Sequence, residues 1–600
     1  MGLPRSAAAL ALVLFSVAAA EPIRAPLPPQ APWHGASEAL IVAADDPWIT
    51  PAEASGFERS ASLEAMGAWL ERLARFSGKV RLLSLGDSPE GRSLTLVLAS
   101  ARGAADLRTL AAGGKPTLFV QAGIHAGEID GKDAGLMLLR DLVVGDEQAL
   151  LEQCNLLFLP VFNIDGHERR SAWSRINQRG PELMGWRTTA RNLNLNRDYA
   201  KADSPEMHAL LGLLARFPVD LYIDVHVTDG ADYQYDITFG WNGAHAYSPA
   251  IAGWLDHRLA PAWNRALERA GHVPGPLIFL VDRLDPTQGI RGWTASPRYS
   301  HGYGDLRHLP TVLVENHSLK DFRRRVLGTR VLLAEAMRVL GAEGAALRRA
   351  VAADRDRRPA VLPLTWEEPA SPPERITFLG VEPRVEVSPI SGDRVVRWTG
   401  EPWRGEVPVR AATEPAIVVR RPAAYWVSAA WSDVIERLAL HGVRFERLAE
   451  PRRVQVEMLR FGEPDFAGRP FEGRLRVGAP YTVERRRWTF PAGSVRVPTD
   501  QPLGDLAISL LEPEGPDSFF QWGFFPEIFQ RTEYAEAYAL EPLARRMLER
   551  DPEIRRRWEQ ALETDPALRG DPRRRLEWFY RRSPYYDQRH RLYPVARELP

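Results

Sequence analysis

The 600-residue sequence predicts an α/β fold that is followed by a β-rich region and a helical tail. Two observations predict this organisation. Between residues 61 and 340, segments with apolar residues at helical spacing alternate with short β-branched runs, which is typical of an α/β sheet. Most of these runs end directly at polar residues, and in open α/β sheets functional sites form at that edge.

Hydrophobic spacing sets the predicted elements of the first part of the chain. Helices are expected where apolar residues recur every three or four positions, at residues 61–76, 131–144 and 321–351. Strands are expected in six short runs of β-branched and large apolar residues, at 80–85, 94–100, 116–121, 156–162, 221–225 and 310–314. The Pro- and Ala-rich residues 21–60 are expected to form an extended leader.

The composition changes after the helix predicted at 321–351. Proline clusters at 357–360 and 368–373 indicate a linker, so we expect a domain boundary near residue 355 and one folded unit over 61–355. Residues 356–510 are expected to form a β-rich accessory region with one helix at 430–441 and strands at 384–387, 394–398, 416–419, 454–460 and 473–477. Residues 511–600 predict a helical, aromatic-rich segment packed on the first domain, or else a contact surface.

The first twenty residues are typical of a signal peptide. Arg5 precedes an apolar stretch from Ala7 to Ala20, and small residues stand just before Glu21, where cleavage is expected. Fourteen apolar residues are too few for a stable membrane span; a retained anchor is the alternative. The sequence therefore predicts export to the periplasm or the medium. Cys154, the only cysteine, cannot form a disulfide within the chain and is expected to be a buried thiol.

The overall charge excludes some classes of partner. Basic and acidic residues balance at 77 each, so no global field favours nucleic acid or an anionic membrane. The sequence also lacks a G-x-S-x-G elbow, a C-x-x-C pair, a Walker loop and an H-E-x-x-H string. Serine hydrolases and nucleotide enzymes are accordingly disfavoured.

Two H-x-x-[DE] strings begin where predicted strands end. With 13 histidines and 77 acidic residues in 600, chance alone predicts one or two such strings, so their number decides nothing. Their placement is more informative, because strands of one sheet can hold side chains that converge on a point. His125 and Glu128 from the first string and His226 from the second supply the three N/O ligands that a catalytic zinc ion needs. Taken singly, each histidine is better explained as a structural residue held by a hydrogen bond than as a metal ligand.

Further strings follow in a fixed order. They are Asn163-Ile-Asp-Gly166, Trp173-Ser-Arg175, Asn192-Leu-Asn-Leu-Asn-Arg197 and Val314-Glu315-Asn316. With the histidine strings, this order resembles the zinc metallocarboxypeptidases of the carboxypeptidase A type over residues 60–340. The resemblance implies a three-layer α/β/α domain with a mixed sheet, one zinc ion and a peptide substrate.

The resemblance also implies roles for individual residues. His125, Glu128 and His226 match the zinc ligands, and Glu315 matches the general base. Arg175 matches the arginine that stabilises the oxyanion, with Arg179 as its rival. The residues that match the substrate's carboxylate-binding pair are Asn196 and Arg197, and the substrate-facing phenol is expected from Tyr303, with Tyr299 as its rival.

Some positions depart from the family's pattern or have simpler explanations. Gly127 stands where digestive members of the family have a substrate-binding arginine, which puts recognition of a free terminal carboxylate in doubt. Asn163–Gly166 is expected to be a simple turn. Asp224 and Asp229 are candidates to orient His226. The alternatives for them are helix capping and exposure to solvent.

The sequence thus predicts an exported zinc-dependent peptidase, in which zinc activates water, a glutamate moves the proton and no acyl-enzyme forms. Two alternatives remain. A deacylase of N-acyl amino acids would use the same zinc elements on the same fold. A secreted binding protein with a vestigial metal site is the second alternative.

Overall fold

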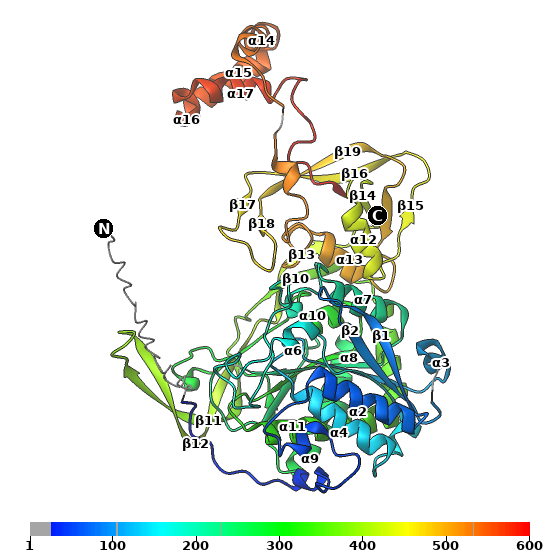
Figure 1. Ribbon diagram of the computed structural model, residues 1–600. Coiled ribbons are helices and arrows are strands. Elements are labelled where there is room, and N and C mark those ends of the chain that lie inside the picture. The colour runs from blue at the N-terminus through cyan, green and yellow to red at the C-terminus, as the bar shows by residue number, and fades with distance from the viewer. Residues whose placement is uncertain (1–25, 104–105, 229, 532, 600) are drawn as a thin grey trace, which may run out of the picture.

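The computed structural model describes residues 26–599 except 104–105, 229 and 532, so the predicted signal peptide and Asp229 lie outside the described residues. Its largest element is an eight-stranded sheet at the centre of the lower body in Figure 1. The strands are β1 (Val80–Asp87), β2 (Ser93–Ala99), β3 (Thr117–Ala122), β4 (Asn155–Leu159), β5 (Leu221–Val227), β6 (Ile237–Gly240), β7 (Pro274–Pro276) and β9 (Thr311–Asn316).

The sheet is mixed. In the order β1-β2-β4-β3-β5-β9-β6-β7, the central strands β4, β3, β5 and β9 are parallel. Antiparallel pairs flank them, β1–β2 and β2–β4 on one side and β9–β6 on the other. The carboxyl ends of β3, β5 and β9 therefore meet at one edge, which is where the sequence places its polar strings.

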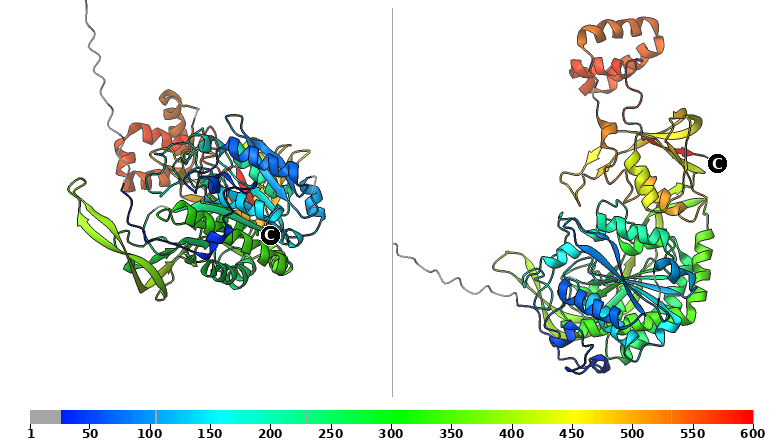
Figure 2. Two further views of the ribbon diagram at one scale, coloured as in Figure 1. Left: turned by 60° about the horizontal axis from the view of Figure 1, so that its bottom comes forward. Right: turned by 45° about the vertical axis from the view of Figure 1, so that its right-hand side comes forward.

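Helices cover the sheet on both sides, so the body has the α/β/α arrangement that was expected (Figure 2). Strands β3, β4 and β5 are buried along their whole length, because both of their faces are covered. The helices of this body are α2 (Leu63–Phe76), α3 (Leu107–Ala112), α4 (Asp130–Val143), α5 (Leu150–Gln153), α6 (Ile164–Glu168), α7 (Pro205–Arg216), α8 (Pro249–Trp254), α9 (Ala260–Arg269), α10 (Ser300–Leu306) and α11 (Phe322–Asp356).

The leader is more ordered than expected. Over residues 26–60 it holds a short 3-10 helix (Ala36–Leu40) and helix α1 (Pro51–Ala54), which a capping box between Thr50 and Glu53 begins. Glu53 also pairs with Arg140 of α4, and both side chains are buried. The leader therefore packs on the body, and this buried ion pair was not visible in the composition of the segment.

Hairpins follow α11. Strand β10 (Val361–Glu367) pairs with β13 (Glu414–Arg420), and a long hairpin of β11 (Glu374–Val387) and β12 (Arg394–Ala411) projects from the body (Figure 1). Strand β8 (Ile290–Gly292) adds to this hairpin by parallel pairing with β12. The strands expected at 384–387, 394–398 and 416–419 are thus parts of longer strands.

A second sheet of six strands forms the upper part of the molecule (Figure 1). Its order is β15-β20-β14-β21-β16-β19, and helices α12 (Ser432–Leu440) and α13 (Gly504–Leu511) belong to the same region. The strands are β14 (Ala424–Val427), β15 (Glu446–Arg447), β16 (Arg452–Phe461), β19 (Tyr481–Phe490), β20 (Val495–Pro498) and β21 (Val595–Glu598), with a small pair of β17 (Asp465–Phe466) and β18 (Val477–Gly478) beside them.

The prediction of a helical segment over 511–600 is wrong at both ends. The aromatic run from Phe519 to Phe525 lies in loops of the buried core, and the chain ends in strand β21 of the six-stranded sheet. Only the stretch between them is helical, and it forms a unit that projects from the top of the molecule instead of packing on the first domain (Figure 1). Its helices are α14 (Ala537–Arg550), α15 (Pro552–Thr564), α16 (Pro566–Gly570) and α17 (Pro572–Tyr580).

Three smaller predictions also have outcomes. The turn expected at Asn163–Gly166 is the start of helix α6, and the Asn163 side chain caps it by accepting from Gly166 N. A strand expected at 473–477 is mostly loop, since Gly473 has a φ of 78° and regular pairing begins at Val477. Cys154 is buried and free, as expected.

Within the described residues, no helix combines the length and apolar character needed to cross a membrane.

Candidate active site

Three buried side chains meet at the carboxyl edge of the eight-stranded sheet. His125 and Glu128 lie in the loop between β3 and α4, and His226 is the penultimate residue of β5. Because β3 and β5 are parallel neighbours with Ala122 opposite Val225, the loop after β3 lies beside the end of β5. His125, Glu128 and His226 are at most 2% exposed.

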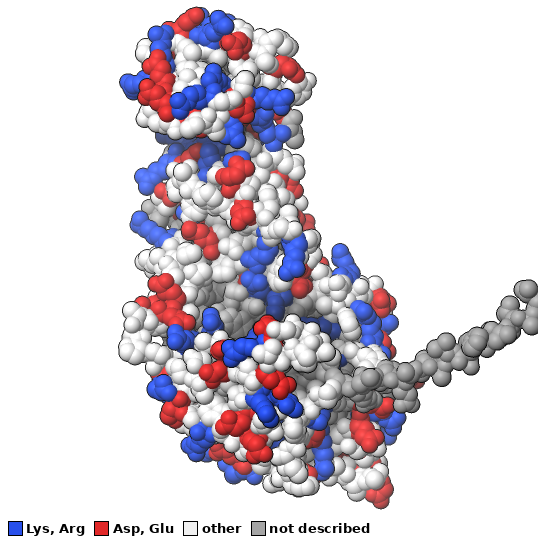
Figure 3. Space-filling view, turned by 90° about the vertical axis from the view of Figure 1, so that its left-hand side faces the viewer, with Lys and Arg blue, Asp and Glu red and all other residues white. Residues whose placement is uncertain are grey.

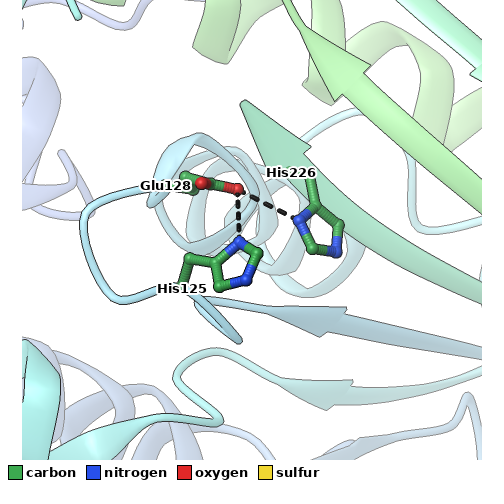
Figure 4. Close-up of side chains that lie close together, drawn as sticks. All are labelled: His125, Glu128 and His226. Carbon is green, nitrogen blue, oxygen red and sulfur yellow. Dashed lines mark hydrogen bonds and ion pairs between the residues drawn. The ribbon is translucent and has the colours of Figure 1, made fainter. Parts of the chain in front are cut away.

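The geometry of the three side chains suits a metal ion. Nδ1 of His125 and Nδ1 of His226 each lie 3.0 Å from Oε2 of Glu128, so both imidazoles face one carboxylate oxygen (Figure 4). One ligand atom from each residue lies within 4.8 Å of the other two. Two imidazoles and one carboxylate are a known ligand set for catalytic zinc.

The outer nitrogens of both histidines are held by other residues. His125 Nε2 is 3.0 Å from Asn194 Oδ1, and His226 Nε2 is 3.0 Å from Asp224 Oδ2. Since amide and carboxylate oxygens only accept, each Nε2 donates a proton, so a neutral imidazole at either position has its lone pair on Nδ1, on the side of the centre. His125 Nδ1 makes no hydrogen bond of normal geometry although it is buried. A buried nitrogen without a hydrogen-bond partner is expected of a metal ligand, because the metal would take the place of that partner. The three residues therefore fit a zinc ion.

Charges around the site favour a cation. Burial lowers the pKa of His125 to about 4, so its imidazole is neutral at neutral pH. Burial alone would raise the pKa of Glu128, but His125 and Arg175 outweigh it and hold that pKa well below its usual value. Burial also works against protonation of His226, yet Asp224, Glu128 and Glu315 raise its pKa. The same carboxylates that hold a proton there would attract a metal cation.

Glu315 lies beside His226 on the next strand of the sheet. The two residues are partners in the parallel register of β5 and β9. Together with the three metal-site residues, Glu315 lines a cavity of about 370 Å³. A carboxylate is thus placed at the side of the centre, where it could accept a proton from water.

The arginines of the site are arranged differently from the expectation. Arg175 donates to Glu128 Oε1 at 2.8 Å and to Val227 O at 3.4 Å, and it is not among the residues that line the cavity. Arg179 donates to the carbonyl oxygens of Pro28 and Leu319 and likewise does not line it. Neither of the two candidates drawn from the sequence therefore faces the cavity.

The structure explains why position 127 is glycine and not the arginine of the digestive family members. A Cβ at this position would lie 2.4 Å from Cδ of Arg175 and 2.9 Å from the carbonyl oxygen of Gly185. The space beside the H-x-x-E string is thus filled by Arg175, whose guanidinium reaches Glu128 from another loop.

Arg187, which the sequence analysis missed, is the arginine that faces the centre. Its side chain is 40% exposed, lines the cavity and donates from NH1 to Glu128 Oε1 at 3.0 Å. It lies in a loop between the Trp173 string and the Asn192 string, and no motif spacing marks it. Only its position in the fold, in contact with Glu128 and at the wall of the cavity, distinguishes it from the other arginines.

Asn196 and Arg197 also line this cavity. They belong to a short 3-10 helix (Leu195–Arg197) that the side chain of Asn194 caps. Burial lowers the pKa of Arg197, whose guanidinium carbon lies 4.4 Å from the centre of the Tyr299 ring. Among the described residues, Arg197 has no ion-pair partner. A half-buried guanidinium that makes no ion pair is a ready site for an anionic group of a ligand.

Of the two candidate tyrosines, Tyr299 is the one at the cavity. Tyr303 is 1% exposed inside helix α10, and its hydroxyl contacts Nδ1 of His441 at 2.9 Å and Arg307 at 3.1 Å. It does not line the cavity, whereas Tyr299 does. The two tyrosines are four positions apart, and the phenol nearer the start of α10 is the one that remains accessible.

Comparison with known proteins agrees with this arrangement. Residues 66–265 match the zinc carboxypeptidase family. Carboxypeptidase 2 of Trichophyton rubrum is 25% identical over 491 residues, covering 77% of this chain and 84% of that protein; its counterpart in Trichophyton tonsurans is 24% identical over the same length and with the same coverage. Carboxypeptidase A of Helicoverpa armigera is 19% identical with a TM-score of 0.36, covering 50% of this chain and 75% of that chain.

Fold and site together define a zinc-dependent hydrolase of peptide bonds. Residues 66–265 of the chain form a domain that matches the zinc carboxypeptidase family. The resemblance drawn from the sequence is thereby confirmed, as are the expected enzyme class and the single zinc ion.

Proposed function

We propose that residues 61–355 form the catalytic domain of a carboxypeptidase that removes the last residue of peptides with a free carboxylate. The observation that carries this proposal is the placement of Arg197, a half-buried guanidinium that makes no ion pair among the described residues, in the same cavity as the metal-site residues and Glu315. A guanidinium binds a carboxylate through two parallel hydrogen bonds, which explains selection for a chain end.

The proposed roles follow from the contacts. His125, Glu128 and His226 would hold the zinc ion, which when bound polarises the scissile carbonyl and activates water. Glu315 takes the proton from the attacking water and returns it to the departing nitrogen, since an amine leaves poorly unless protonated.

The remaining cavity residues bind the substrate and stabilise charge. Arg187 faces the centre and is proposed, in place of Arg175, as the donor to the developing oxyanion. Asn196 and Arg197 hold the terminal carboxylate, and Tyr299, in place of Tyr303, faces the substrate. Arg175 is proposed to position Glu128 by its hydrogen bond to Oε1.

Export is proposed on the signal-like residues 1–20, with the periplasm or the medium as destination. The test is detection of the mature chain starting at Glu21 outside the cytoplasm. Retention of Met1 in a cytoplasmic protein would contradict the proposal.

The test of the carboxypeptidase proposal compares one peptide with a free and with an amidated C-terminus. The free peptide should be cut and the amidated one should not, while Arg197→Gln should lower kcat/KM for the free peptide about 100-fold. Arg191→Gln, an exposed arginine in the same loop, is the matched control. Release of the acyl group from N-acyl amino acids without peptide cleavage would favour a deacylase, and zinc binding without any turnover would favour a vestigial site.

A further inference from the structure

A turn of the accessory region reaches the loop that supports the metal site. It spans Phe471–Arg474, whose ends are joined by an antiparallel bridge. Glu472 has a φ of 51° and Gly473 a φ of 78°, so both central residues are left-handed, as in the tight turns of hairpins. A glutamate rarely adopts this conformation and keeps it only where its surroundings hold it.

The surroundings of the turn are rigid. Arg474 makes a two-pronged ion pair with Asp203, from Nε to Oδ2 at 2.6 Å and from NH2 to Oδ1 at 2.7 Å. Arg437 of α12 donates to Oδ1 of the same carboxylate at 2.9 Å. Phe471 stacks on Trp522 with ring centres 5.9 Å apart and planes at 6°. The Arg474 end of the turn is therefore paired with the catalytic body, and the Phe471 end is stacked on an aromatic residue of the C-terminal part of the chain.

The side chain of Glu472 makes one contact that matters for the metal site. Its Oε2 accepts a hydrogen bond from the backbone N–H of Asn194 at 2.7 Å. The side-chain Oδ1 of Asn194 then accepts from Asn196 N at 2.9 Å and lies 3.0 Å from His125 Nε2. One residue, 278 positions away in the sequence, thus fixes the backbone of the asparagine that orients a metal-site histidine.

We propose that Glu472 is a positioning residue through which the accessory region completes the catalytic centre. Without its carboxylate, the buried Asn194 would lose the acceptor of its N–H, and the side chain that sets the tautomer and orientation of His125 would be free to move. This explains why the turn is left-handed at a glutamate: the conformation directs the carboxylate at Asn194. The inference rests on the proposed function only in taking His125 as a zinc ligand.

The experiment uses the full chain with Glu472→Ala and Glu472→Gln, and Glu450→Ala as a control at an exposed glutamate of the same region. Zinc affinity is measured by competition with a chelator on the metal-free protein, beside kcat/KM and the melting temperature. Glu472→Ala should weaken zinc binding about 10- to 100-fold. Glu472→Gln should stay within about threefold of the wild type, because its amide oxygen accepts the same hydrogen bond.

Several results would overturn the proposal. Wild-type zinc affinity in Glu472→Ala would do so, and so would a Gln variant as impaired as the Ala variant. If Glu472→Ala melts well below the wild type, Glu472→Asp becomes the decisive variant: it keeps the charge but shortens the reach, and full zinc affinity in it would contradict a role for the hydrogen bond. His125→Ala separates the two proposals, because stoichiometric zinc in that variant refutes the ligand assignment whatever Glu472 does.

Discussion

His226 and Glu315 are register partners on adjacent parallel strands, one on β5 and the other on β9. Side chains at paired positions of neighbouring strands point to the same face of the sheet. The strand register therefore places His226 and Glu315 side by side. Asp224, two residues before His226, points to the same face and holds its Nε2. The period of the strand thus places the proposed ligand, its orienting carboxylate and the proposed base on one face of the sheet.

Replacing Glu315 tests the role of the base. Glu315→Gln keeps the size of the side chain but cannot take a proton, so kcat should fall about 10²- to 10⁴-fold. Metal analysis should still find one zinc per chain, since Glu315 is not one of the proposed ligands. The exposed Glu401→Gln is the control, and activity near the wild-type level in Glu315→Gln would remove this residue from the mechanism.

Substitutions of Arg187 and Arg175 should impair different properties of the enzyme. Arg187→Ala removes the arginine that faces the cavity, and loss of one oxyanion donor costs about 3 to 4 kcal/mol, or roughly 10²- to 10³-fold in kcat. Arg175→Ala removes a buried donor to Glu128 and should act mainly on zinc affinity. Steady-state kinetics at saturating zinc, beside a chelator titration, distinguish the two. The reverse pattern would return the oxyanion role to Arg175.

Much of the fold could be predicted because buried strands appear in the sequence as short runs of β-branched and apolar residues. Six of the eight strands of the main sheet were predicted. The two that were missed, β6 and β7, have four and three residues, and β7 reads Pro-Gly-Pro. Such short strands carry no periodicity, and proline argues against a strand.

The candidate site was predictable where its residues end strands and not where loops supply them. His125, Glu128, His226 and Glu315 all follow or end predicted strands, and the structure brings them together. Arg187 and Glu472 reach the site from loops, so their roles depend on tertiary packing that no local pattern encodes. Choosing between Tyr299 and Tyr303 required knowing where helix α10 begins, and helix ends are the least certain feature of a sequence-based assignment.

The charge of the cavity predicts a preference for acidic C-terminal residues. Arg187, Arg197 and Arg291 line it, while its two carboxylates, Glu128 and Glu315, have proposed roles at the metal. Arginine and lysine side chains also gather in the hollow where the upper and lower parts of the molecule meet (Figure 3). Within the described part of the chain Arg291 has no ion-pair partner, so it is available to a substrate side chain.

Matched peptides that end in Glu, Leu or Lys measure this preference. The Glu peptide should have the highest kcat/KM, and Arg291→Gln should lower its advantage about fivefold, the scale of one partly exposed charge pair. The advantage should also shrink at high salt. Arg410→Gln, a partly exposed arginine outside this cavity, is the control. Equal rates for the three peptides would contradict the prediction.

Buried His441 predicts how stability depends on pH. It lies between Tyr303 and the carbonyl oxygen of Ala200, where it joins the accessory region to the body. Burial, aided by Arg307 and Arg437, lowers its pKa to about 3. An unfolded histidine titrates near 6.5, so below that pH the unfolded chain binds a proton that the folded chain does not. Stability from this group is therefore complete above pH 6.5 and is lost as the pH falls toward 3.

The loss amounts to about 1.4 kcal/mol per pH unit, or about 2 kcal/mol at pH 5. His441→Gln should lower the melting temperature at pH 7.5, because Gln cannot match both hydrogen bonds, but should lose less than the wild type between pH 7.5 and 5. Calorimetry at both values measures the difference, with exposed His34→Gln as the control. If the wild type and His441→Gln lose equal stability between pH 7.5 and 5, His441 is protonated in the folded protein. That result would contradict its burial as a neutral group between the accessory region and the body.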